Sequence, residues 1–104
     1  MVKRPQPGLV RDRVLRRAPD ALTRTIAGET LLIPVKGRLA DLQRIFALDP
    51  SAAFIWERLD GKRELGAILG ALTEEFDVAA EEAAADLTAF IQELEAAGLL
   101  AEVS

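Results

Sequence analysis

The longest regular pattern in this chain is helical and covers residues 77–98. Its apolar residues recur at helical spacing and form one stripe, which we expect to face a core. The stripe consists of Ala80, Ala83, Leu87, Phe90, Ile91 and Leu94. Gly98 stands where a left-handed C-terminal cap belongs, and Leu99 and Leu100 are expected to pack against the core after it.

After its first residues the same helix carries five carboxylates and neither Lys nor Arg. They are Glu81, Glu82, Asp86, Glu93 and Glu95. The predicted strands and two shorter helices that precede it have an order that suits a winged helix. A helix that enters a DNA groove needs cations to replace the counterions it releases, so the charge of this helix argues against a DNA-reading role.

The first of the two shorter helices has a clear start. Asp49 followed by Pro50 predicts a helix N-terminus, because Asp accepts a free backbone N–H and proline has none to leave unpaired. We interpret Trp56 as a core anchor and expect Asp60 and Gly61 to close the helix. The apolar face comprises Ala52, Ile55, Trp56 and Leu59.

The second short helix is predicted over residues 64–75. Its apolar residues in helical register are Leu65, Ile68, Leu69 and Leu72. Gly66 and Gly70 lower its intrinsic helix propensity by up to about 1 kcal/mol each relative to alanine. Close approach of another helix would explain these two glycines.

Three extended runs precede the helices. Residues 22–26 and 30–35 are β-rich and are separated by a short stretch that contains Gly28, which can take the positive φ of a tight connection. This pair is predicted to be a hairpin. A third run, residues 44–48, leads into the first helix.

Composition excludes most catalytic chemistry. The chain has no Cys, His or Tyr, and its only serines are Ser51 and Ser104. Thiolate and imidazole chemistry is therefore absent, and we expect neither an enzyme nor a metal site nor a bound cofactor. No run approaches the roughly 20 apolar residues of a membrane span, and no signal peptide is evident, so we expect a cytoplasmic protein without a membrane partner.

Charge is unevenly distributed along the chain. Residues 1–48 hold ten basic and four acidic side chains, a net charge of +6, whereas residues 49–104 hold three basic and thirteen acidic ones, a net charge of −10. A basic half and an acidic half can steer a charged peptide into one orientation, or their opposite charges can pair with each other between layers of the fold. Both interpretations stay open.

The N-terminus is predicted to be a flexible basic arm over residues 1–18, followed by one folded domain over residues 19–104. Pro5, Pro7 and Gly8 interrupt it, and its charged residues outnumber its apolar ones. The arm could contact nucleic acid or simply solubilise the chain.

Four segments together resemble the PqqD family. They read ALDPSAAFIWERLDG (47–61), ELGAIL (64–69), EEFDV (74–78) and ADLTAFIQELEAAGLL (85–100). The resemblance implies an α+β fold in which a three-stranded antiparallel sheet packs on a three-helix, winged-helix-like bundle. Residues 38–43 form an insertion relative to family members of quinone biosynthesis. The chain therefore resembles either a relative that serves another modified peptide or a member that has lost its peptide role.

The family is the precursor-peptide recognition element of ribosomally made peptide pathways. The resemblance implies that the leader of a precursor peptide adds as a strand beside the third strand, in a cleft against the third helix, and is handed to a maturase, often a radical S-adenosylmethionine enzyme. Mapped onto this chain, the peptide-binding residues are Arg44, Ile45, Phe46, Ala47 and Leu48 on the strand and Asp86, Ala89, Phe90 and Glu93 on the helix.

Each of these residues also has a structural interpretation. Alternation along a strand sends only one of Ile45 and Phe46 outward, Phe90 lies on the core stripe, and Arg44 could pair with an acid of the chain itself. Two other functions also stay open. One is a winged-helix nucleic-acid binder, and the other is a dimerisation module whose sheet edge pairs with a second copy.

Overall fold

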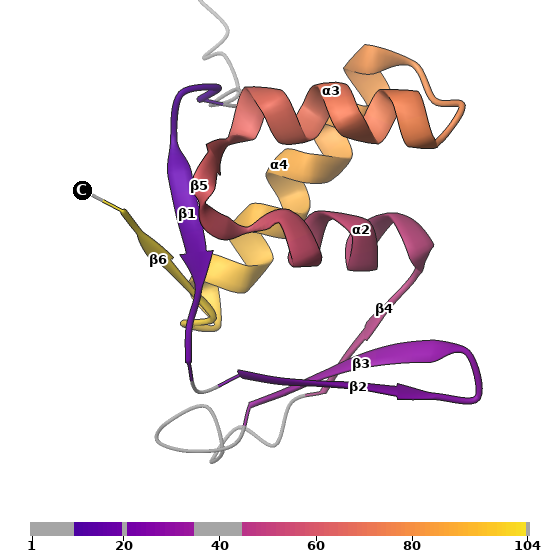
Figure 1. Ribbon diagram of the computed structural model, residues 1–104, viewed down its shortest axis with the longest axis vertical. Helices are drawn as coiled ribbons and strands as arrows, with labels where there is room; N and C mark the ends of the chain where they lie inside the picture. The colour runs from indigo at the N-terminus through magenta and orange to yellow at the C-terminus, as the bar shows by residue number, and fades with distance from the viewer. Residues whose placement is uncertain (1–9, 20, 35–44, 104) are drawn as a thin grey trace, which may run out of the picture.

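The computed structural model describes residues 10–19, 21–34 and 45–103. The described part of the chain is α+β, with most strands before the helices (Figure 1). In chain order the elements are β1 (Val14–Arg17), β2 (Ala21–Ile26), β3 (Glu29–Pro34), β4 (Phe46–Leu48), α2 (Pro50–Arg58), β5 (Asp60–Glu64), α3 (Leu65–Glu75), α4 (Ala80–Ala96) and β6 (Leu100–Glu102).

The predicted three-stranded antiparallel sheet is present and has the order β2-β3-β4. Its hairpin turns at Ala27 and Gly28, whose φ angles of 53° and 84° are both positive. This is the turn geometry whose twist matches that of two paired strands. The hairpin prediction is therefore confirmed, and β4 joins β3 with Leu31 opposite Ala47.

A second three-stranded sheet, with the order β5-β1-β6, was not predicted. Its central strand β1 lies inside the segment interpreted as a flexible arm, and Leu15 in that strand is only 1% exposed. The boundary at residue 18 is therefore wrong, because β1 belongs to the folded domain. Residues 1–9 lie outside the described part of the chain.

The structure also corrects two expectations about the short helices, one on the end of α2 and one on the glycines of α3. Helix α2 ends at Arg58, so Asp60 and Gly61 begin β5 instead of closing the helix, although Gly61 does have a positive φ of 80°. Among the described residues, no helix packs at the glycines of α3. A Cβ on Gly66 would lie 3.1 Å from the Cβ of Arg11, so the N-terminal segment makes the close approach there, and a Cβ on Gly70 would meet no described atom within 4 Å.

Two other predicted helix caps, at Asp49 and at Gly98, are confirmed. The side chain of Asp49 accepts a hydrogen bond from the backbone N–H of Ala52 at 2.8 Å, and Pro50 is the first helical residue. At the other end of the helical region Gly98 has a φ of 75°, and the N–H of Leu99 donates to the carbonyl of Leu94 at 2.9 Å. This left-handed ending turns the chain back so that Leu99 is fully buried.

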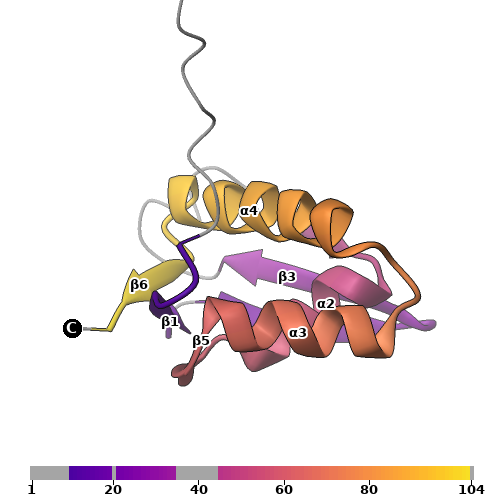
Figure 2. The same ribbon diagram turned by 90° about the horizontal axis from the view of Figure 1, so that it is seen from above.

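The core lies between the helices and the inner faces of the two sheets. Leu32 and Leu48 enter it from the first sheet, Leu15 enters it from the second, and the three helices supply most of the rest. Helices α2, α3 and α4 all lie on one face of the β2-β3-β4 sheet, and β1, β5 and β6 gather at the end where α4 finishes (Figure 2).

Trp56 is 3% exposed, as a core anchor should be, and its indole N–H donates to the Thr23 hydroxyl at 2.9 Å. That bond links α2 to the first sheet.

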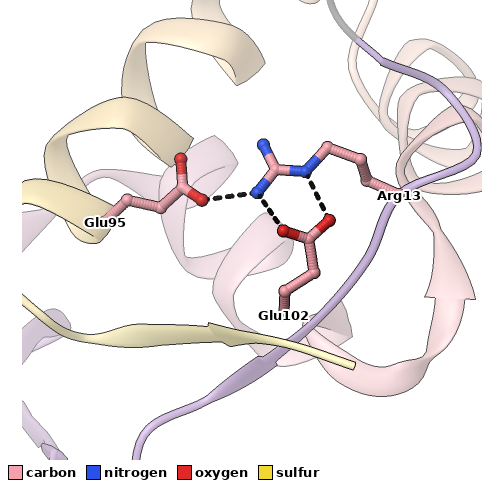
Figure 3. Close-up of polar contacts among 3 residues, drawn as sticks. All are labelled: Arg13, Glu95 and Glu102. Carbon is pink, nitrogen blue, oxygen red and sulfur yellow. Dashed lines mark hydrogen bonds and ion pairs between the residues drawn. The ribbon is translucent and has the colours of Figure 1, made fainter. Parts of the chain in front are cut away.

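One arginine joins the N-terminal segment to two distant elements. The Arg13 guanidinium donates to both carboxylate oxygens of Glu102, at 3.0 and 3.2 Å, and to Glu95 near the end of α4, at 2.5 Å (Figure 3). The hydrogen bonds from Arg13 lower the pKa of Glu102 below its usual value, and those with Glu102 and Glu95 raise the pKa of Arg13. The start of the described chain is thereby held to its end.

Candidate functional site

A groove of about 400 Å³ lies between β4, the start of α2 and α4. Its lining residues are Phe46, Ala47, Leu48, Asp49, Ser51, Ala52, Ile55, Asp86, Ala89, Phe90 and Glu93. They come from three elements that meet at one border of the β2-β3-β4 sheet. The groove therefore runs beside a sheet edge.

Strand β4 forms the edge of that sheet within the described part of the chain, because it pairs with β3 alone in the order β2-β3-β4. Its side chains alternate as a strand requires, with Ala47 exposed and Leu48 buried. Ile45 precedes the strand and is 58% exposed, whereas Phe46 is half-buried and lines the groove. An edge strand beside a groove is suited to pair with an extended peptide through main-chain hydrogen bonds.

Helix α4 forms the opposite wall of the groove. Four of its residues are spaced i, i+3, i+4 and i+7 and therefore share one face, namely Asp86, Ala89, Phe90 and Glu93. The core-facing side of the helix buries Ala83, Leu87, Ile91 and Leu94. Phe90 lies at the boundary, half-buried and packed against the core, and Ala89 is exposed with the smallest side chain of the wall.

The start of α2 lines the groove with residues near the N-terminal end of that helix. Asp49 holds that end in place, because its Oδ1 accepts hydrogen bonds from the Ala52 backbone N–H at 2.8 Å and from the Ser51 hydroxyl at 3.0 Å. Ile55 lies one helical turn further along α2 and adds an apolar side chain to the lining.

The charge of the groove is of one sign. Its described lining contains the carboxylates of Asp49, Asp86 and Glu93 and neither Lys nor Arg. Neither Asp86 nor Glu93 forms an ion pair with another residue of the described chain. The groove therefore combines apolar side chains with carboxylates of a single charge sign.

Seven of the nine residues predicted to bind peptide line this one groove. Of the other two, Ile45 lies outside the lining, and Arg44 lies outside the described residues. Sequence reasoning missed the contribution of α2, made by Asp49, Ser51, Ala52 and Ile55. A signal for it was available, because Asp49 directly follows β4 and the helix start must therefore lie next to the strand end.

A second hollow, of about 510 Å³, lies on the hairpin side of β4. It is lined by Gly28, Glu29, Thr30, Ala47, Leu48, Asp49 and Pro50. Ala47, Leu48 and Asp49 belong to both hollows, so the free space extends along β4 from α4 towards the hairpin turn.

The described residues form neither a metal site nor a membrane-spanning helix. Residues 10–19, 21–34 and 45–103 contain no group of three His, Cys, Asp or Glu side chains placed to hold a metal ion. Within the same ranges, no helix has the length and apolar character that a membrane crossing requires.

Comparison with known proteins gives one family. The family model described as "Coenzyme PQQ synthesis protein D (PqqD)" matches residues 29–100. A protein named "PqqA binding protein" from Rhizobium meliloti (strain 1021) is 41% identical over 63 residues, which cover 59% of this chain and 64% of that protein. The aligned region thus spans slightly less than two thirds of that relative.

Two solved structures share the fold. "TbiB1 in Complex with the TbiA(beta) Leader Peptide" has a TM-score of 0.66 at 22% identity and covers 82% of this chain and 93% of its own. "Lasso peptide synthetase B1 complexed with the leader peptide" has a TM-score of 0.68 at 23% identity, with 84% and 96% covered. Because the family model matches well over half of the chain, this chain belongs to the PqqD family.

Proposed function

We propose that this chain is a binding adaptor that recognises the leader of a ribosomally made precursor peptide by strand addition at β4. The observation that carries this proposal is the position of β4, at the edge of its sheet and directly beside the groove. The name of the Rhizobium meliloti relative, which binds PqqA, supports it, and so do the leader peptides in both structures of the same fold.

In strand addition, the main chain of the guest peptide provides affinity and its side chains provide selectivity. The main chain of the guest pairs with the edge strand whatever its sequence, and alternate side chains of the guest enter the groove. Ala89 leaves room there for a guest side chain, while Phe90 and Ile55 offer it apolar contact. The peptide-binding residues in this proposal are the seven that line the groove, together with Ile45, which precedes β4, and Arg44, which lies outside the described residues.

The bound leader would be presented to a modifying enzyme, for which a radical S-adenosylmethionine maturase is the proposed partner. The chain itself supplies no chemistry in this scheme. Its contribution is to hold a flexible peptide in one conformation. The modifying enzyme then binds the precursor at a smaller entropic cost.

A bulky side chain in the groove tests the proposal. We expect Ala89→Trp to weaken binding of a leader peptide that the wild-type chain binds at least about tenfold, because it fills the space that a guest side chain needs. Isothermal titration calorimetry measures the affinity. Ala85→Trp is the matched control, since Ala85 is exposed on the same helix but outside the groove. Equal affinity for both variants would contradict the proposal.

A further inference from the structure

The groove wall combines apolar and acidic groups in a fixed order along α4. Asp86 and Glu93 lie at its two ends, and Ala89 and Phe90 lie between them on the same face. With a rise of 1.5 Å per residue, seven helical positions separate the two carboxylates by about 10 Å along the helix axis. A guest strand lying against α4 thus meets a negative charge, an apolar stretch and a second negative charge.

We infer that the leader read by this groove carries two basic residues four positions apart, with an apolar residue midway between them. This inference rests on the proposed function, because it specifies the peptide that the same groove accepts. Alternate residues of a strand point to one side and repeat every ~6.8 Å, so positions i, i+2 and i+4 span about 13–14 Å. Flexible Lys or Arg side chains cover the remaining difference of roughly 3 Å to the two carboxylates.

The charges of the groove select this pattern over its alternatives. Asp86 and Glu93 have no cationic partner among the described residues, so a cation supplied by a guest competes with no ion pair formed within that part of the chain. Asp49 in the groove lining adds a third negative charge. A leader with acidic residues facing α4 would meet like charges in a partly desolvated channel, and that repulsion disfavours binding.

Selection from a random peptide library tests the inference without knowledge of the natural precursor. Displayed ten-residue peptides are selected on the wild-type chain, and peptides that also bind Ala89→Trp are removed, so that only groove binders survive. We expect the survivors to be enriched in the pattern basic-x-apolar-x-basic. Replacing both basic residues of a selected peptide with norleucine, which keeps the aliphatic length, is expected to weaken binding about two- to thirtyfold, as two exposed ion pairs allow.

The reciprocal change is made on the protein. Asp86→Asn with Glu93→Gln should reproduce that loss for the basic peptide and leave the norleucine peptide unaffected. Glu81→Gln with Glu82→Gln removes the same charge from the same helix outside the groove and should change affinity less than about twofold, because neither side chain lines the groove or can pair directly with a guest held in it.

The possible results separate the two proposals. Groove binders without the basic pattern, or binders indifferent to Asp86→Asn with Glu93→Gln, would overturn the inference and leave strand addition intact. If no peptide is lost on counter-selection with Ala89→Trp, the groove does not bind extended peptides, and both proposals fail.

Discussion

The two sheets of this protein are alike in size and opposite in construction. The β2-β3-β4 sheet pairs strands that follow one another in the chain, whereas β5-β1-β6 joins strands from its beginning, middle and end (Figure 1). The second sheet has a buried leucine on its central strand and binds the two ends of the described chain together. The first sheet ends in β4, which borders both hollows.

This contrast separates a stabilising sheet from a sheet that can accept a guest. Leu15 and the Arg13 contacts hold the termini of the domain against α4, and α4 in turn forms the wall of the groove. A groove whose wall is anchored from behind can bind a peptide with little rearrangement, which lowers the cost of ordering on association.

The largest expected effect is a loss of stability when the β5-β1-β6 sheet is disrupted. Leu15→Ala removes a side chain that is 1% exposed and leaves a cavity, so we expect it to lower the free energy of unfolding by about 2–5 kcal/mol. Urea denaturation followed by circular dichroism measures the change. Val10→Ala is the control, because Val10 is 52% exposed in the same N-terminal segment and should change stability by less than about 0.5 kcal/mol. A Leu15→Ala variant as stable as the control would restore the interpretation of residues 1–18 as an arm.

A smaller expected effect on stability depends on pH and comes from the ion pair between Arg13 and Glu102. Arg13 lowers the pKa of Glu102 in the folded state, so this carboxyl stabilises the fold above its unfolded pKa, near the ordinary value of 4.5, and the stabilisation is lost as pH falls through the lower folded value. We expect the stability difference between the wild type and Glu102→Gln to be constant near neutral pH and to shrink below about pH 4.5.

The measurement is thermal unfolding of both proteins across that pH range. Glu57→Gln removes a carboxylate that has no ion-pair partner among the described residues and serves as the control. A Glu102→Gln difference that does not shrink at all as the pH falls below about 4.5 would show that the Arg13 contact does not provide the stabilisation.

Local signals predicted one of the two sheets and left the other unseen. The β2-β3 hairpin, the Asp49 cap and the Gly98 ending each depend on residues a few positions apart, and all three were recognised. Strand β5 reads DGKRE, a polar sequence typical of a turn, and becomes a strand only because β1 lies beside it. Pairing across such sequence distances has no local pattern, so β1, β5 and β6 could not be predicted.

The groove was predictable in part for the same reason. Helical spacing, together with the family resemblance, placed Asp86, Ala89, Phe90 and Glu93 on one wall, and the structure brings that wall to β4. The contribution of α2 depends on how the chain turns at Asp49, which was recognised as a cap but not as a site residue.

Intermolecular nuclear Overhauser effects between the isotope-labelled chain and an unlabelled bound leader peptide test the central claim most directly. Strand addition predicts close contacts between the peptide backbone and that of Ala47 and Leu48, together with contacts from alternate peptide side chains to Ala89. A bound peptide that contacts only the β5-β1-β6 sheet, or no residue of β4, would contradict it.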